Sequence, residues 1–179
     1  MVKTLSSFFS KDLIKSKNII SNTVSNSTKL RVAIVGAGHM GFANAKAVNE
    51  SGIAEVICVV DKNTDAGKKL ASKVSAEYFK DMNDINKIQN IDIVFISVPH
   101  DLLTPLAIQA AKMGKHLIVE KPVSINLHEI SKLISVCREN EVCVTSNYWL
   151  RYLPMVQLAK KIISMGAIGE IIGTEVQVH

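Results

Sequence analysis

The sequence has little of what marks membrane, disulfide-rich or metal-binding proteins. No apolar run approaches the ~20 residues that cross a bilayer, so no membrane partner is predicted. Only three cysteines are present, Cys58, Cys137 and Cys143, and none has C-x-x-C spacing. They fall in apolar stretches, so we expect buried reduced thiols and predict neither disulfides nor a metal site. This cysteine usage fits a reducing compartment such as the cytoplasm.

The formal net charge of +5 is concentrated at the N-terminus. Residues 1–29 hold five Lys and one acid, Asp12, so the other 150 residues carry a net charge of only about +1. No basic face therefore predicts a nucleic-acid partner. Ser, Lys, Asn and Thr fill 18 of the first 29 positions, which predicts a disordered tail. The alternative is a mitochondrial transit peptide, favoured by Ser richness and basic charge but opposed by Lys in place of Arg.

The stretch Leu30–Gly41, LRVAIVGAGHMG, predicts a buried strand, a tight turn and the start of a helix. Its apolar run is typical of a parallel sheet and leads into the spacing G-x-G-x-x-G. In this motif Gly36 allows the sharp turn, Gly38 lets a pyrophosphate approach the backbone, and Gly41 lets the helix pack against the strand. The glycine spacing alone also fits an ordinary strand-to-helix turn, so the surrounding residues decide between the two interpretations.

Those surroundings predict a dinucleotide site. The N–H groups at the helix start, at His39 and Met40, are free to face phosphates. A second apolar run, Val56–Val60, ends in Asp61, where an acidic side chain would accept hydrogen bonds from an adenosine ribose. Because Lys62 follows and could meet a 2′-phosphate, NAD is the preferred cofactor and NADP stays open.

The rest of the chain alternates strand and helix patterns, which predicts a right-handed, doubly wound parallel sheet of the α/β class. Strands are expected at Glu55–Val60, Tyr78–Phe79, Ile91–Val98, Leu117–Val119 and Glu141–Ser146. Helices are expected over residues 38–50, 65–75 and 81–89, over the segment between Pro99 and Gly114, and over residues 126–137.

The turn after the strand Ile91–Val98 lies at the edge of the sheet where ligands bind. We expect it to line the nicotinamide side of the crevice through Ser97, Val98, Pro99 and His100. His100 is the only ionisable ring there. A polar turn residue that never touches substrate explains it equally well.

Two charged residues, Glu120 and Lys121, follow the fifth strand directly. A surface ion pair would explain two charges. Pro122 comes immediately after them, however, and fixes the backbone as a positioned lysine would require. Both interpretations stay open on the residues alone.

Taken together, these segments resemble the glucose-fructose oxidoreductase, inositol dehydrogenase and MocA family of NAD(P)-dependent oxidoreductases. The matching segments, spread over residues 30–179, are GAGHMG, VVD, ISVP, AAKMGKHLIVEKP, RYLP and MGAIGEI. The resemblance implies hydride transfer between nicotinamide and a polyol, sugar or similar hydroxyl carbon. It also implies a catalytic or substrate-orienting role for Lys121, a place for Glu120 in the same pocket, and a cis bond before Pro122.

The sequence departs from the family pattern in two respects. Many members have Asn after the motif proline and His four residues after it, where this chain has His100 and Leu103. The family's substrate domain, an open antiparallel sheet with the catalytic Asp and His, is almost wholly missing from these 179 residues. We therefore expect the general base to lie elsewhere, and we do not interpret His179 as the missing catalytic histidine.

The predicted organisation is a tail over residues 1–29, a dinucleotide-binding Rossmann domain over 30–147, and the start of a truncated α+β substrate domain over 148–179. That start consists of a helix over Pro154–Met165 and an alternating strand over Glu170–His179. A lone strand needs neighbours, so we expect pairing with a second copy, pairing with a partner chain, or disorder from about residue 166 onward. Two other functions stay open: a non-catalytic dinucleotide-binding module, and a domain for another adenosine ligand such as a methyl donor.

Overall fold

The computed structural model describes residues 29–177, so almost all of the predicted tail and the last two residues lie outside it. Within this range six parallel strands form one sheet in the order β3-β2-β1-β4-β5-β6. The strands are β1 Leu30–Val35, β2 Ala54–Val60, β3 Glu77–Phe79, β4 Ile93–Ile96, β5 His116–Val119 and β6 Val144–Ser146. The predicted doubly wound parallel sheet is therefore confirmed.

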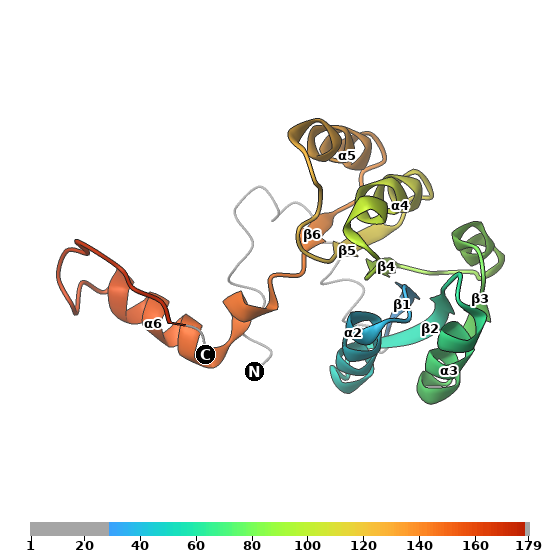
Figure 1. Ribbon diagram of the computed structural model, residues 1–179, viewed down its shortest axis with the longest axis horizontal. Coiled ribbons are helices and arrows are strands. Elements are labelled where there is room, and N and C mark those ends of the chain that lie inside the picture. Colours follow the sequence, from blue (N-terminus) through green and yellow to red (C-terminus); the bar gives the residue numbers. More distant parts are fainter. Residues whose placement is uncertain (1–28, 178–179) are drawn as a thin grey trace.

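Helices cover both faces of this sheet (Figure 1). One face packs against α2 and α3, and the other packs against α4 and α5. The α-helices are α2 His39–Glu50, α3 Thr64–Val74, α4 His100–Lys112, α5 Leu127–Glu139 and α6 Pro154–Ser164, and the 3₁₀-helices are η3 Met82–Lys87 and η4 Trp149–Tyr152. Burial on both faces explains why the strands read as continuous apolar runs rather than alternating ones.

Local capping explains several helix starts. Asn63 accepts hydrogen bonds from the N–H groups of Asp65 and Ala66, both at 3.1 Å, and so begins α3. Asn126 accepts from Glu129 N at 2.9 Å at the start of α5, as the capping-box pattern predicts. The helix expected over residues 81–89 is instead the short 3₁₀-helix η3, Met82–Lys87.

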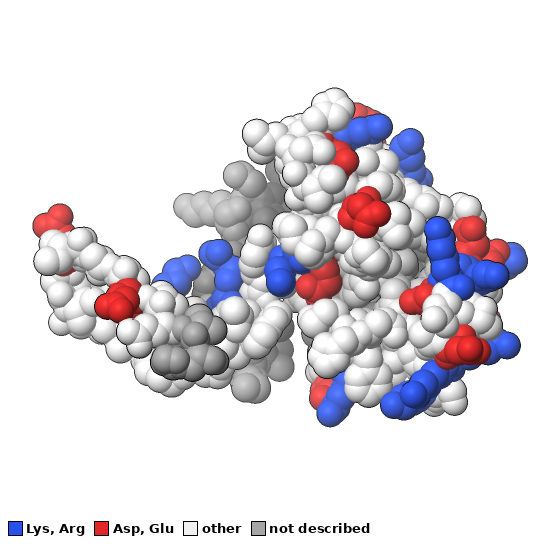
Figure 2. Space-filling model, viewed as in Figure 1, with Lys and Arg blue, Asp and Glu red and all other residues white. Residues whose placement is uncertain are grey.

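The chain after β6 leaves the sheet. Helix α6 projects away from the domain (Figure 1), and it is capped by Leu153 without a side-chain hydrogen bond. Its apolar face is exposed: Val156 and Ile163 each keep 44% of their surface accessible. In the view of Figure 2 this projecting segment carries both acidic and basic side chains, as the sheet domain does.

The strand expected over Glu170–His179 is wrong for the part that the structure describes. Residues 171–177 have no regular secondary structure. The alternation of Val176 with polar neighbours suits a strand, but no described strand lies beside it to satisfy its backbone groups. Within residues 29–177, no helix is both long and apolar enough to cross a membrane.

The cysteine prediction holds at two of three positions. Cys58 and Cys137 are buried and Cys143 is exposed, and all three are free thiols. Burial, and then the nearby carboxylate of Glu77, raise the pKa of Cys58 to about 12, so this thiol stays protonated and unreactive at neutral pH. The expectation for Cys143 failed because the residue precedes β6, at the edge of the sheet.

Replacement of Leu133 by Ala is expected to destabilise the domain by about 2–5 kcal/mol, because its side chain is fully buried between α5 and the sheet. The matched control is Leu127→Ala on the same helix. Leu127 is 85% exposed, so its removal should change the free energy of unfolding by less than about 0.5 kcal/mol. Urea unfolding of both variants checks this, and equal costs would contradict the described packing of α5.

Candidate dinucleotide-binding site

The residues that follow the strands form a row along the carboxyl edge of the sheet. Each donates its backbone N–H to a carbonyl of the neighbouring strand, at distances between 2.7 and 3.2 Å. The pairs are Gly36 to Val60, Asp61 to Phe79, Ser97 to Val35, Glu120 to Ile96 and Asn147 to Val119. These bonds extend the sheet by one residue and fix the backbone where parallel sheets bind ligands.

The three motif glycines occupy three different environments. Gly36 has φ of 100°, and a Cβ there would overlap the carbonyl oxygen of Ser97. A Cβ on Gly41 would overlap the carbonyl oxygen of Gly36, so only glycine lets α2 approach β1 so closely. Gly38 has open space where its Cβ would be. The close contacts at Gly36 and Gly41 agree with the roles predicted for them from the sequence, and the open space at Gly38 is compatible with the predicted approach of a phosphate.

The N-terminus of α2 has hydrogen-bond donors to spare. Gly38 caps the helix without a side-chain hydrogen bond, and the first turn holds no acidic residue. The first α-helical bond runs from Phe42 N to Gly38 O at 3.0 Å, which leaves the N–H groups of His39 and Met40 without a helical acceptor. Both residues are exposed. Free N–H groups and the positive end of the helix dipole suit a pyrophosphate.

Asp61 ties the end of β2 to the glycine turn. Its Oδ2 accepts a hydrogen bond from Ala37 N at 2.6 Å, and its Oδ1 accepts one from Asn63 N at 2.7 Å. The carboxylate thus stands between the turn and α3, where the ribose of an adenosine would lie. A hollow of about 530 Å³ opens beside it, and Phe42 and Lys73 line it with the Lys73 Nζ 4.7 Å from the Phe42 ring centre.

Glu120 lies buried on the other half of the edge. Its Oε1 accepts hydrogen bonds from Asn44 Nδ2 at 2.9 Å and from Asn147 Nδ2 at 2.7 Å. Asn44 Nδ2 also donates to Ser97 Oγ at 2.9 Å, and Asn147 Nδ2 also donates to Asn44 Oδ1 at 3.3 Å. Four elements of the fold are therefore joined by one network around a single carboxylate.

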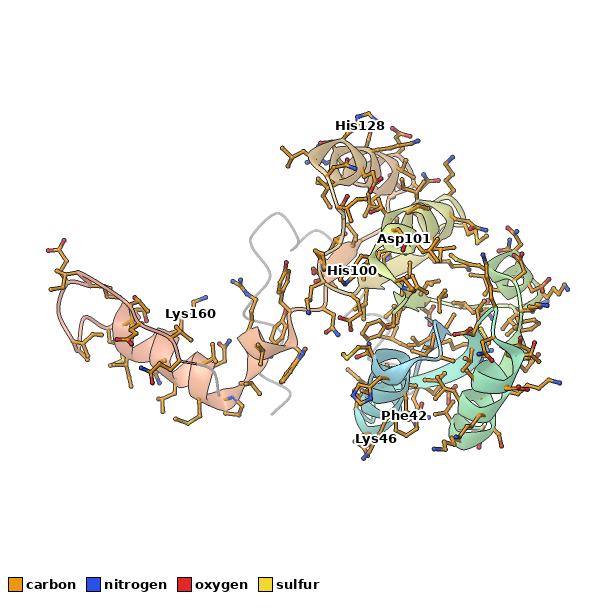
Figure 3. The ribbon with its side chains drawn as sticks, viewed as in Figure 1. Phe42, Lys46, His100, Asp101, His128 and Lys160 are labelled. Carbon is orange, nitrogen blue, oxygen red and sulfur yellow. The ribbon has the colours of Figure 1, made fainter. Side chains whose placement is uncertain are left out.

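Lys121 and the turn after β4 are more exposed to solvent than Glu120. The Lys121 side chain is exposed, and the bond between Lys121 and Pro122 is cis, as expected. Val98 and Pro99 follow Ser97, and Val98 packs partly against the core. His100 is exposed at the first residue of α4, with Asp101 beside it, and His128 on α5 lies away from this turn (Figure 3).

Sequence reasoning missed Asn44 and Asn147. Each offered a weak signal. In the sequence, Asn44 is a polar residue between the small apolar residues Ala43 and Ala45. In the structure, only 7% of its surface is exposed. Asn147 is the first residue after β6, at the edge where ligands bind. Neither signal names a partner, because the contacts link residues 76 and 27 positions from Glu120.

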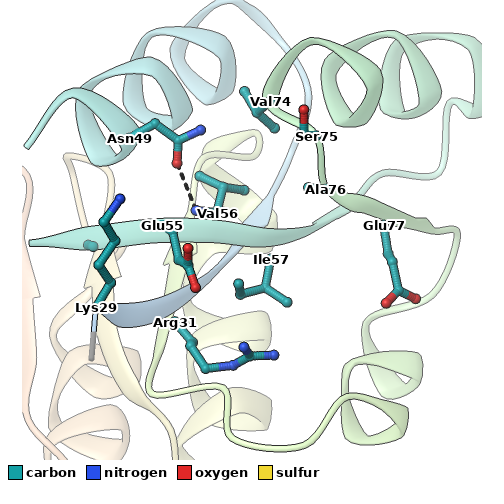
Figure 4. A pocket seen from close by; sticks show the side chains of 11 residues that line it. Lys29, Arg31, Asn49, Glu55, Val56, Ile57, Val74, Ser75, Ala76 and Glu77 are labelled. Atoms are coloured by element: carbon teal, nitrogen blue, oxygen red, sulfur yellow. Dashed lines mark hydrogen bonds between the residues drawn. The ribbon is translucent and has the colours of Figure 1, made fainter. Parts of the chain in front are cut away.

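A second, larger hollow lies elsewhere on the described part of the chain. Its volume is about 690 Å³, and it sits at the amino ends of β1, β2 and β3, where Arg31, Glu55 and Glu77 line it (Figure 4). None of the predicted site residues borders it. Parallel sheets bind ligands at the carboxyl ends of their strands, which is the opposite edge. The geometry therefore favours the smaller hollow, beside the glycine turn, as the cofactor site.

An open approach at Gly38, donors at the start of α2 and an acid after β2 define an NAD-binding Rossmann domain. The family model described as "Oxidoreductase family, NAD-binding Rossmann fold" matches residues 30–148, and the chain belongs to this GFO/IDH/MocA family.

Known members resemble the chain over part of their length. It is 27% identical over 142 residues to an inositol 2-dehydrogenase of Rhizobium meliloti, covering 79% of this chain and 43% of that one. A crystal structure of a myo-inositol 2-dehydrogenase from Lactobacillus plantarum superposes with a TM-score of 0.75 at 26% identity, covering 81% of this chain and 44% of that one.

A second structure is the WlbA dehydrogenase from Bordetella pertussis, in complex with NADH and UDP-GlcNAcA. It has a TM-score of 0.75 at 27% identity, and the match covers 80% of this chain and 44% of that one. The chain spans between 37% and 45% of the length of the curated relatives it matches.

Replacement of Gly38 by Val is expected to lower NADH affinity at least about tenfold, because the side chain would fill the approach that a pyrophosphate needs. The φ of Gly38 is −72° and its surroundings are open, so the variant should fold. Gly173→Val, which places the same side chain in open space away from the sheet, is the control. Titration with NADH, followed by nicotinamide fluorescence, checks this. Unchanged NADH affinity in Gly38→Val would show that the pyrophosphate does not bind at this turn.

Proposed function

We propose that the protein is the cofactor-binding part of an NAD-dependent oxidoreductase that acts on a polyol, sugar or similar hydroxyl carbon. The observation that carries this proposal is the glycine turn, where open space at Gly38 adjoins uncapped N–H groups of α2. The activities of the relatives, inositol dehydrogenases among them, support the substrate class. When bound, the cofactor would supply the hydride chemistry, and the protein would supply binding and orientation.

The chain's own residues take distinct roles in this proposal. Gly38 and the N–H groups of His39 and Met40 bind the pyrophosphate, while Asp61 accepts hydrogen bonds from the adenosine ribose. Gly36 and Gly41 shape the turn and do not need to touch the cofactor. An acid at position 61 favours the free 2′-hydroxyl of NAD over the phosphate of NADP.

On the nicotinamide half, we assign Ser97 to His100 to the wall of the crevice and Lys121 to the substrate. The Lys121 side chain is exposed just after β5, and in this proposal its ammonium group donates a hydrogen bond to the reacting hydroxyl of the substrate. We also propose the boundaries 30–147 for the cofactor domain and 148–179 for the beginning of a substrate domain. We assign the general base to none of these 179 residues.

One observation favours a second candidate, a non-catalytic dinucleotide-binding module. Apolar residues of α6 are exposed, and among described elements α6 contacts mainly η4. A second copy or partner chain that covers this face would suit a module that works within an assembly. The two candidates share the cofactor and differ in turnover.

Asp61→Ala is expected to weaken NADH binding more than NADPH binding, because only NADH has a free 2′-hydroxyl that can donate a hydrogen bond to this carboxylate. Parallel titrations with both reduced cofactors measure the ratio of their affinities. Asp84→Ala, which removes an acid of η3 that pairs with Lys87 at 2.7 Å, should leave that ratio unchanged. Should both cofactors weaken equally in Asp61→Ala, the acid would support only the turn.

Lys121→Ala is expected to lower kcat by about 10²-fold or more in the enzyme completed by its substrate domain, as for an acid–base or orienting group. The melting temperature should stay the same, because the side chain is exposed. Lys132→Ala, an exposed lysine on α5, is the control. Steady-state kinetics with a polyol substrate checks this. Loss of stability with ordinary turnover would return Lys121 to a structural role.

A further inference from the structure

Glu120 is the only charged residue that is buried within residues 29–177, with 6% of its surface exposed. The ion pairs in this range are Lys46 with Glu50 and Lys87 with Asp84, and neither involves it. A buried carboxylate is costly unless a positive charge or several hydrogen bonds compensate it. The described part of the chain thus holds one buried anion with no cation within ion-pair distance.

The hydrogen bonds to Glu120 are distributed unevenly between its two carboxylate oxygens. Two side-chain amides, from Asn44 and Asn147, donate to Oε1. Among the described residues, Oε2 receives only the backbone N–H of Lys121, at a long 3.4 Å. Amide donors stabilise the ionised form, but they carry no charge that could neutralise it. Oε2 therefore keeps acceptor capacity and uncompensated charge.

The position of Glu120 on the sheet indicates which positively charged group could approach it. The pyrophosphate site lies at the start of α2, and Asp61 after β2 marks the adenosine half of the edge. The other half of a dinucleotide then extends over the ends of β4, β5 and β6, where Ser97, Glu120 and Asn147 stand in a row. The nicotinamide ring is the group that comes to this half, and in its oxidised form it carries a positive charge.

We infer that Glu120, held in place by Asn44 and Asn147, is a counter-charge for the oxidised nicotinamide ring and makes this site favour NAD⁺ over NADH. The inference rests on the proposed function, since it assumes a dinucleotide in this site. Asn44 and Asn147 are positioning residues in it: they keep the carboxylate in one orientation without touching the ring. The reduced ring is neutral and gains nothing from the carboxylate.

Isothermal titration of the 179-residue chain with NAD⁺, NADH and ADP-ribose tests this inference. The wild type should bind NAD⁺ at least as tightly as NADH. Glu120→Gln should weaken NAD⁺ about tenfold, the loss expected for one partly screened charge interaction. NADH and ADP-ribose should change less than about twofold, because neither carries the positive ring. A purely structural role for Glu120 would weaken all three ligands together.

Two further variants separate charge from position. Asn147→Ala keeps the carboxylate but removes one donor to Oε1, so part of the NAD⁺ preference should be lost. Glu141→Gln removes one negative charge from an exposed turn before β6, at the far edge of the sheet, and should change no affinity. Circular dichroism reports whether each variant folds.

The outcomes are distinguishable. If the wild type binds ADP-ribose and both nicotinamide forms but prefers NADH, or if Glu120→Gln leaves the NAD⁺ to NADH ratio unchanged, the inference is wrong and the proposed function stands. If the wild type binds none of the three ligands, the proposed function fails and takes the inference with it. Should Glu120→Gln fail to fold, the wild-type preference and Asn147→Ala still decide.

Discussion

The contact between Gly41 and the carbonyl oxygen of Gly36 sets the geometry of the whole site. No side chain fits between the two, so the first turn of α2 rests directly on the end of β1. This close approach fixes the height of the helix above the sheet. Asn44, one turn further along, then reaches both Ser97 Oγ and Glu120 Oε1 at 2.9 Å. A motif that is usually explained by phosphate binding also orients the opposite half of the site.

A parallel sheet concentrates polar groups at one edge because all its strands end there. The cost is that some of them are buried, since helices cover both faces. In this protein the backbone of the edge is satisfied by the neighbouring strands, and the side chains satisfy one another through two asparagines. The network does not neutralise the negative charge of the Glu120 carboxylate. That charge is the property of this edge that the hydrogen bonds of the fold do not explain.

The sequence was sufficient for the sheet and for the glycine turn, because both depend on local patterns. Apolar runs of four or five residues mark β1, β2 and β4, and the motif glycines mark the turn. The links from Asn44 and Asn147 to Glu120 were not predictable, since nothing local distinguishes a buried asparagine from an exposed one. The wrong strand near Val176 is the converse case. Its alternation is a local signal, but a strand exists only through partners.

The residues proposed to bind the cofactor do not depend on helix α6. They lie at the strand ends, in α2 and at the first residue of α4, and the core beneath them is closed by α2 to α5. Helix α6 adds no residue to that core, because every side chain it carries is at least partly exposed. The core beneath the proposed cofactor site is therefore closed without any residue of α6. Because the match covers only 43% and 42% of two of these relatives, the residues proposed to bind the dinucleotide belong to a part of the family fold that is separate from the remaining length of those proteins.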